Sequence, residues 1–389
     1  MYTGQTVFAQ LMQLAPREAF GKAVRAYQGN RGVRSFPCWS QFLCMAYAQL
    51  TGRSSLRDIE TCLNAHPERL YHMGFRGTIA RSTLAEANEN RDFRIYSHFA
   101  RCLIAKARAL YRDEELAVEL DQTVYALDST TIDLCLALFP WARFRKTKGA
   151  VKMHTLLDLR GAIPAFVTVS TGKLHDVNVL DVVPLEAESI VTMDRAYVDF
   201  RRLYTIHRLP AYFVVRAKRN VLFRRLRSAP VDKGAGVRAD QSVMLKTTRS
   251  REFYPEALRR VVFYDTAKAR RLVFLTNHFD IPAPTVAEIY RQRWQVELFF
   301  KWIKQHLRIK AFFGTSPNAV KTQIWTAISL YLLVAIAKKT LDLPGSLHTI
   351  LHILEVNAFE RKPINQLVSD ALRHDKEPCN SNQLNLFEN

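Results

Sequence analysis

The hydrophobic positions of the first 118 residues recur at helical spacing. Two helix start signals accompany them, because Ser55 precedes Asp58 by three positions and Thr83 precedes Glu86 by three. The pattern therefore predicts an all-helical N-terminal domain over residues 1–118. A helix of this domain could enter a DNA groove, or the domain could be a scaffold with solvated arginines; the arginines in question are Arg53, Arg57, Arg76, Arg81, Arg91 and Arg94.

From about residue 119 the apolar residues alternate or form short runs, which is typical of strands. Three consecutive antiparallel strands are expected in VELDQTVYALDSTTIDL, GAVKMHTLLDL and AIPAFVTVS. A short helix, a buried strand (SIVTMD), a longer helix (DFRRLYTIHRL) and a further strand (AYFVVRAK) follow. This order indicates a mixed α/β layer.

A basic, strand-rich stretch over residues 217–283 interrupts the α/β pattern before a long helix that starts near Thr285. We interpret this stretch as a β-rich insertion. The α/β domain then covers residues 119–340, and residues 341–389 form a C-terminal helical segment with a polar tail.

The longest apolar run, Ile324–Ala337, spans 14 residues, fewer than the roughly 20 that a membrane-spanning helix needs. It is predicted to be a buried helix. The N-terminus shows no uninterrupted hydrophobic region, and the six cysteines form no Cys-x-x-Cys pair. These features predict a cytoplasmic chain with reduced thiols, without a membrane span or a zinc site.

Composition and charge narrow the class of protein. Hydrophobic residues make up 48% of the chain and charged residues 24%, which excludes a disordered protein. The 56 Lys and Arg residues exceed the 36 Asp and Glu residues and leave a formal net charge of +20. An excess of this size points to a polyanionic partner, most simply nucleic acid.

Two acidic residues stand where a strand is expected to be buried or to end. Asp128 lies inside the first strand, and Asp194 lies at the carboxyl end of SIVTMD. A buried carboxylate is costly unless a cation compensates it, so two such acids suggest a metal site. A helix cap or a salt bridge to an arginine would explain either acid on its own.

A third acid lies on the long helix. Tyr290, Arg293, Glu297 and Lys304 fall within about 60° of one another at 100° per residue. An ordinary amphipathic helix with a solvated charged face would show the same pattern. The charged face also carries Lys301 and Arg308, and another face carries Phe299, Phe300, Ile303 and Leu307.

The spacing Tyr-(2)-Arg-(3)-Glu-(6)-Lys resembles the signature of the insertion-sequence-4 family of DDE transposases. The stretches ALDSTTIDL, KGAVKMHTLLD, MDRAY and FFGTSPNAVKTQIWTAISLYLLVAI are also similar to this family. The resemblance covers about residues 120–340, with a looser likeness in the N-terminal helices. It implies an α/β fold with an RNase H-like catalytic core and a β-rich insertion, preceded by an all-helical N-terminal DNA-binding domain.

The resemblance also implies roles for single residues. Asp128, Asp194 and Glu297 would be the DDE triad that holds two Mg²⁺ ions, with Mn²⁺ as the alternative, and carboxylates are the ligands that such hard cations prefer. Other residues of the same helix would contact the DNA backbone near the transposon end. These are Tyr290, Arg293 and Lys304, together with Lys301 and Arg308.

Further cations lie between the first two strands. This loop could follow a phosphate backbone close to the metals, or it could be a solvated charge run. Its cations are Arg143, Arg145, Lys146, Lys148 and Lys152.

Three smaller features bear on mechanism. Asp176, next to His175, stands where it could simply cap a helix. The insertion has no tryptophan to stack on a flipped base, although Phe223 or Tyr254 could take that place. In MDRAY, Ala196 stands where the family resembled leads us to expect glycine, so the turn there must use ordinary dihedral angles.

The leading hypothesis is a transposase that binds the terminal inverted repeats of an insertion sequence and catalyses Mg²⁺-dependent strand cleavage and strand transfer. Its partners would be double-stranded DNA, both transposon ends and target, and a second copy of the chain in a homodimer on paired ends, within the bacterial nucleoid. An RNase H-like DNA endonuclease without strand transfer and a catalytically inactive DNA-binding relative are the alternatives. A covalent recombinase with Tyr290 as nucleophile would need an arginine and histidine cluster around the scissile phosphate, and the residues around Tyr290 are better explained by the acid triad.

Overall fold

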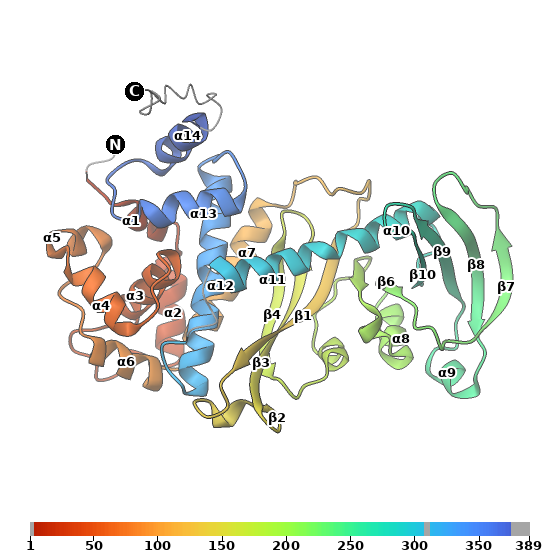
Figure 1. Ribbon diagram of the computed structural model, residues 1–389, viewed down its shortest axis with the longest axis horizontal. Coiled ribbons are helices and arrows are strands. Elements are labelled where there is room, and N and C mark those ends of the chain that lie inside the picture. Colours follow the sequence, from red (N-terminus) through yellow and green to blue (C-terminus); the bar gives the residue numbers. More distant parts are fainter. Residues whose placement is uncertain (1–3, 307–311, 375–389) are drawn as a thin grey trace, which may run out of the picture. The chain divides into compact units, whose positions relative to one another are not determined.

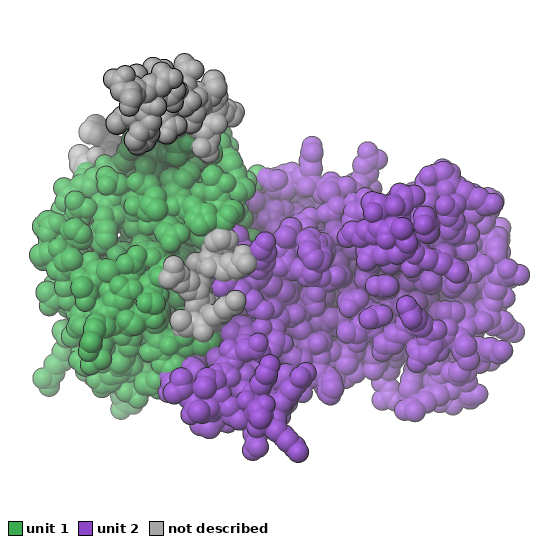
Figure 2. Space-filling model, viewed as in Figure 1, with its two compact units in different colours: residues 1–103, 306–314, 322–389 green, residues 104–305, 315–321 purple. Residues whose placement is uncertain are grey.

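The computed structural model describes residues 4–306 and 312–374. The chain divides into two compact units (Figure 2). Unit 1 comprises residues 1–103, 306–314 and 322–389, and unit 2 comprises residues 104–305 and 315–321. The boundaries between the units fall within two long helices, α7 (Arg94–Leu110) and α12 (Pro317–Thr340). The predicted boundaries instead lie after residues 118 and 340.

The described part of unit 1 is helical, as the spacing of its apolar residues predicts. One predicted helix start is confirmed, since Ser55 caps α4 by accepting a hydrogen bond from the Asp58 N–H at 3.1 Å. The other, at Thr83, is wrong: α6 begins at Arg81, whose N–H donates instead to Glu60 on α4 at 2.7 Å. The helices that precede α7 are α1 (Val7–Gln13), α2 (Arg17–Ala26), α3 (Cys38–Leu50), α4 (Leu56–Asn64), α5 (Pro67–Leu70), the 3₁₀ turn η1 (Tyr71–Met73) and α6 (Arg81–Asn90).

Segments that are far apart in the sequence, α1 and residues 358–360, meet in unit 1. The N–H groups of Val7 and Phe8 on α1 donate to the carbonyls of Glu360 and Ala358, at 2.8 and 3.1 Å. The C-terminal helices α13 (Leu347–Val356) and α14 (Ile364–His374) therefore belong to the same compact unit as the N-terminal helices. No pattern in the sequence predicted this pairing.

The apolar run Ile324–Ala337 lies inside α12 and is buried throughout, which confirms the predicted core helix. By length and composition α12 could cross a membrane, but 94% of its most apolar window is buried inside the protein. Burial of this extent is expected of a core helix in a large domain.

Unit 2 is built on a ten-stranded sheet in the order β2-β3-β1-β5-β6-β10-β9-β8-β7, with β4 paired to the far side of β3 (Figure 1). Strands β1, β3 and β4 are antiparallel, as predicted, whereas β5 runs parallel to both β1 and β6. The strands are β1 (Val124–Leu134), β2 (Arg143–Arg145), β3 (Lys148–Asp158), β4 (Ile163–Thr171), β5 (Ile190–Met193), β6 (Tyr212–Arg216), β7 (Phe223–Ala229), β8 (Val237–Leu245), β9 (Leu258–Asp265) and β10 (Arg270–Thr276).

The basic stretch 217–283 does not form a separate layer. Its strands β7 to β10 continue the same sheet, because β10 pairs antiparallel with β6. Only the short helix α9 (Thr248–Phe253) leaves the sheet. The expected β-rich region is therefore present, and it is an extension of the central sheet.

The sheet carries different chemistry on its two faces because side chains alternate along each strand. Tyr125, Leu127, Val191 and Met193 belong to an apolar core that also takes in Leu203 of the helix α8 (Phe200–Arg208). The opposite face is covered by α10 (Ala283–Gln292), which packs on β6 and β9 (Figure 1).

The predicted long helix is interrupted in the middle of its signature. Helix α10 ends at Gln292 and α11 (Trp294–His306) begins two residues later. Arg293 lies between them with helical dihedral angles, in a tightened turn where its N–H bonds to Tyr290 and its carbonyl to Val296. Phe299, Phe300 and Ile303 on α11 are buried, as expected, while Leu307 lies outside the described residues.

The turn between β3 and β4 yields a test of the fold. Gly161 has φ +71°, and a Cβ there would stand 2.0 Å from the Tyr111 ring. We expect Gly161→Ala to lower the free energy of unfolding by about 2 kcal/mol or more, measured by urea denaturation. Ala162, also left-handed at φ +56°, is the matched control: Ala162→Gly should change stability by less than about 1 kcal/mol. Equal effects of the two substitutions would contradict this turn.

Candidate active site

Two of the three candidate acids are neighbours across parallel strands. The register of β1 and β5 pairs Leu127 with Met193, so Asp128 and Asp194 are the next residues on adjacent strands. Alternation places both on the face opposite the apolar core. Asp128 stands within β1, but at the level where β5 ends, which is the carboxyl edge where open α/β sheets bind ligands.

The helix residues converge on these acids through Arg293. Its Nη1 donates to Asp128 Oδ2 at 2.9 Å and its Nη2 donates to Glu297 Oε1 at 2.6 Å. The Tyr290 hydroxyl donates to Asp194 Oδ1 at 3.3 Å. All three predicted triad acids thus lie within one network of Tyr290 and Arg293.

The fourth signature residue, Lys304, donates from Nζ to the Thr131 carbonyl of β1 at 2.8 Å. All the signature side chains are thus bonded within unit 2, and their contact with DNA stays a prediction. Lys301 is exposed on α11, and Arg308 lies outside the described residues.

Burial dominates the electrostatics of Asp128. The pKa of this carboxyl is raised from 3.8 to about 6, chiefly by burial and to a smaller extent by the nearby Glu297 and Asp194. The Ser129 N–H, 2.8 Å from Asp128 Oδ1, and the Arg293 guanidinium act in the opposite direction. A carboxylate in this setting calls for positive charge beside it.

A divalent ion fits these residues in chemistry but not in their present arrangement. Across residues 4–306 and 312–374, no group of three or more His, Cys, Asp or Glu side chains is arranged to hold a metal ion. The donors are nevertheless carboxylates, and the buried hydroxyls of Thr155, opposite Asp128, and Thr192, two residues before Asp194, have no hydrogen-bond partner. Such hydroxyls suit the water molecules that Mg²⁺ retains.

A cavity of about 500 Å³ opens beside Asp128 and Asp194. Asp176 also lines it and accepts hydrogen bonds from the Ser129 hydroxyl at 2.7 Å and from Lys152 Nζ at 3.0 Å. Burial opposes ionisation of Asp176, but these two bonds hold its pKa below the usual value. Sequence reasoning treated Asp176 as a possible cap; the structure makes it one of four acids that line the cavity, with Asp128, Asp133 and Asp194, and leaves His175 exposed.

The basic loop is a hairpin at the rim of this cavity. Its cations Arg143, Arg145, Lys146 and Lys148 are all exposed. Arg145 and Lys148 are paired between β2 and β3, and both line the cavity.

The aromatic alternatives to an inserted tryptophan differ in accessibility. Tyr254 is fully buried, and its hydroxyl is 2.6 Å from His207 Nδ1, so its expected role as a base-stacking surface is wrong. Phe223, at the start of edge strand β7, is half-buried. Ala196 has no left-handed φ, as expected.

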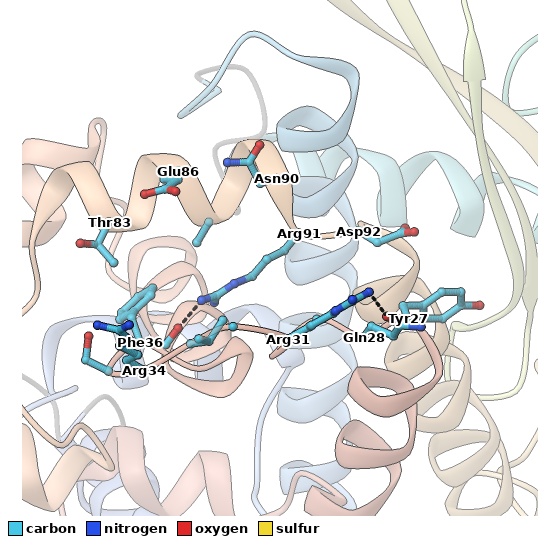
Figure 3. Close-up of a pocket in the computed structure, with 15 residues that line it drawn as sticks. Tyr27, Gln28, Arg31, Arg34, Phe36, Thr83, Glu86, Asn90, Arg91 and Asp92 are labelled. Carbon is cyan, nitrogen blue, oxygen red and sulfur yellow. Dashed lines mark hydrogen bonds between the residues drawn. The ribbon is translucent and has the colours of Figure 1, made fainter.

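Unit 1 has a cavity of its own, of about 440 Å³ (Figure 3). The exposed Arg31 and Arg34 stand on the loop after α2, and Arg91 lies across the cavity. Arg91 donates to the Phe36 carbonyl and, at 3.1 Å, to Gln41 Oε1, so it holds the loop in place. Sequence reasoning included Arg91 but missed the two loop arginines, which carry no helical signal.

Residues 119–333 match the family model described as Transposase DDE domain. The chain belongs to this transposase family. Residues 3–76 match a second family, a domain of unknown function (DUF4372).

Relatives of this transposase come from several bacteria. A protein of Geobacillus stearothermophilus named probable transposase for insertion sequence element IS5377 is 29% identical over 255 residues, which cover 65% of this chain and 66% of the relative, just under two thirds. A Synechocystis protein named as a transposase for element IS4SA is 25% identical over 81% of this chain and 87% of its own. A solved structure of the piggyBac transposase synaptic complex with hairpin DNA is 11% identical, with a TM-score of 0.45, over 98% of this chain and 83% of that one.

The raised pKa of Asp128 predicts a pH-dependent effect on stability. The folded state binds a proton more tightly than the unfolded state, so the ionised Asp128 destabilises the metal-free transposase increasingly as pH rises from about 4 through 6. In EDTA at pH 7.5, we expect Asp128→Asn to raise the free energy of unfolding, by at most about 3 kcal/mol.

The gain should shrink towards zero as the pH falls to about 4, where the wild-type carboxyl is itself protonated. Chemical denaturation of both proteins across this range measures the difference. Asp133→Asn, an exposed position of the same strand, controls for loss of one negative charge. A lower stability of Asp128→Asn than of the wild type at pH 7.5 would contradict the raised pKa of Asp128.

Proposed function

We propose that this protein is a transposase of the insertion-sequence-4 family that cleaves and transfers DNA strands with Asp128, Asp194 and Glu297. The observation that carries the proposal is the network in which two adjacent strand residues and a helix residue are drawn together by Arg293 and Tyr290. Three carboxylates in one site are the donor set of divalent-metal phosphodiester chemistry. The mixed sheet, with antiparallel β4, β3 and β1 followed by parallel β5 and β6, supports an RNase H-like core.

The three acids would hold Mg²⁺, or Mn²⁺ in its place. Such ions activate a water or a 3′-hydroxyl and stabilise the leaving oxygen in an in-line displacement. The chain's own contribution is positional. Ser129 fixes one oxygen of Asp128 through its N–H, and its hydroxyl bonds to Asp176, which Lys152 holds in turn.

The DNA would be bound by exposed cations of both units. The hairpin cations at the cavity rim can contact phosphates near the acids, and the loop arginines of unit 1 can contact the terminal repeat. The proposed DNA partners are the transposon ends and the target DNA. The protein would act as a homodimer on paired ends, within the bacterial nucleoid. The net charge of +20 supports a DNA partner.

The geometry argues against Tyr290 as a covalent nucleophile. Burial raises the pKa of its hydroxyl, and Asp194, to which that hydroxyl donates, raises it further. A nucleophilic tyrosine is favoured by the opposite shift, and the carboxylate that accepts its proton here, Asp194, is one of the acids proposed to hold the metal. Hydrolysis without strand transfer would use the same acids, so an experiment is needed to distinguish an endonuclease from a transposase.

The test is a joining assay on DNA that carries the element's own ends, with Mg²⁺. We expect end-specific cleavage and joining by the wild type, and loss on the order of a thousandfold or more in Glu297→Gln while DNA binding persists. Glu288→Gln, an acid-to-amide change on α10 away from the network, should retain activity. Cleavage without joining would establish the endonuclease, and full activity of Glu297→Gln would exclude the triad.

A second test concerns the cavity of unit 1. Because Arg31 and Arg34 are exposed, Arg31→Ala/Arg34→Ala should fold normally but weaken binding to the terminal repeat. Loss of two phosphate contacts lowers the slope of log affinity against log salt by about 2. Fluorescence anisotropy over a salt series measures it. Lys22→Ala, an exposed cation paired with Glu18 on α2, should change the slope by less than about 1, and an unchanged slope in the double variant would remove this cavity from the DNA interface.

A further inference from the structure

The guanidinium of Arg293 pairs with two of the three acids that would hold a metal ion. Asp128 has one oxygen committed to the Ser129 N–H, and Arg293 takes the other, Oδ2, at 2.9 Å. The second amino group of Arg293 takes Glu297 Oε1 at 2.6 Å. One oxygen of Asp128 and one of Glu297, on two of the three acids that would hold a divalent ion, are therefore already paired with a cation.

This pairing answers a physical need of the metal-free protein. Glu297 and Asp194 are both close enough to Asp128 to repel its charge, and the side chain of Asp128 is only 20% exposed. Uncompensated, these charges would drive the site apart. Arg293, itself 13% exposed, supplies one positive charge and reaches two acids at once, which its forked guanidinium allows and a lysine ammonium does not.

We propose that Arg293 is an exchangeable internal counter-cation, which balances the acids without metal and releases both carboxylates when a divalent cation binds. This inference rests on the proposed function, because it assumes that the acids take metal. Two consequences follow. Metal and guanidinium compete for the same oxygens, so Arg293 weakens metal binding. The released guanidinium then gains the freedom to fork onto a DNA phosphate, so metal binding and DNA binding strengthen each other.

The experiment measures Mn²⁺ binding to the full-length protein without DNA, by isothermal titration calorimetry. We expect Arg293→Met to bind Mn²⁺ at least tenfold more tightly than the wild type, because no internal cation must be displaced. Arg291→Met is the matched control, since it removes the same charge two residues away from an arginine that is 67% exposed and paired with Glu288. Its affinity should match the wild type, and Glu297→Gln should lose binding at this site.

Stability gives a second readout that does not need metal. Thermal unfolding in EDTA should show Arg293→Met below the wild type, and saturating Mn²⁺ should raise its melting temperature by more than that of the wild type. If Arg293→Met fails to fold, Arg293→Lys serves instead, because it keeps the charge but cannot bridge both acids. It should bind Mn²⁺ with an affinity between those of the wild type and Arg293→Met.

The outcomes separate the two proposals. Equal Mn²⁺ affinity in the wild type and in the Arg293 variant, with binding lost in Glu297→Gln, would overturn the counter-cation and leave the metal site standing. No binding by the wild type together with binding by the Arg293 variant would support the counter-cation in its strongest form. No binding by either would overturn both the counter-cation and the metal part of the proposed function.

Discussion

Mutual repulsion among carboxylates at the edge of a sheet is the constraint on which unit 2 depends. Asp128 and Asp194 are adjacent because the parallel strand β5 ends beside Asp128 of β1, and Glu297 of α11 is linked to Asp128 through Arg293. Such a cluster persists in a low-dielectric site only if a cation balances it. In the metal-free protein the guanidinium of Arg293 does so, and this explains why the residue stands at the break between α10 and α11 and not within a regular turn.

The rest of unit 2 keeps these groups in register. Alternation along β1 and β5 gives one face to the apolar core under α8 and the other to the acids, so a one-residue slip of either strand would bury a carboxylate in that core. Lys304 ties α11 to β1 through the Thr131 carbonyl. The continuation of the sheet into β10 lets Phe274 pack against the Tyr290 ring at 4.9 Å, which supports the helix that carries the signature.

Features that depend on neighbouring residues could be predicted from the sequence, and features that depend on contacts between distant segments could not. The antiparallel pairing of β1, β3 and β4 and the buried apolar helix follow from local periodicity, whereas the expectation that the three acids converge comes from the resemblance to a known family. The pairing of β10 with β6, the bonding of α1 to residues 358–360 and the place of Asp176 in the cavity depend on contacts between distant segments. The turn at Arg293 was also not predicted, because the side chain of Arg293 bonds to Asp128, which lies 165 positions away in the sequence.

Charge separation within unit 2 connects the site to its ligand. The acids are partly buried and already paired, while Arg145 and Lys148 are exposed at the rim of the same cavity. An approaching phosphate backbone would meet the rim cations before it meets the acids, so attraction at the rim would offset the repulsion expected from a cluster of carboxylates. The same arrangement explains how a chain with a net charge of +20 can keep an acidic reaction centre. The negative charge of the acids is partly balanced from within by Arg293 and Lys152, and under the proposed function the exposed positive charge would engage the DNA.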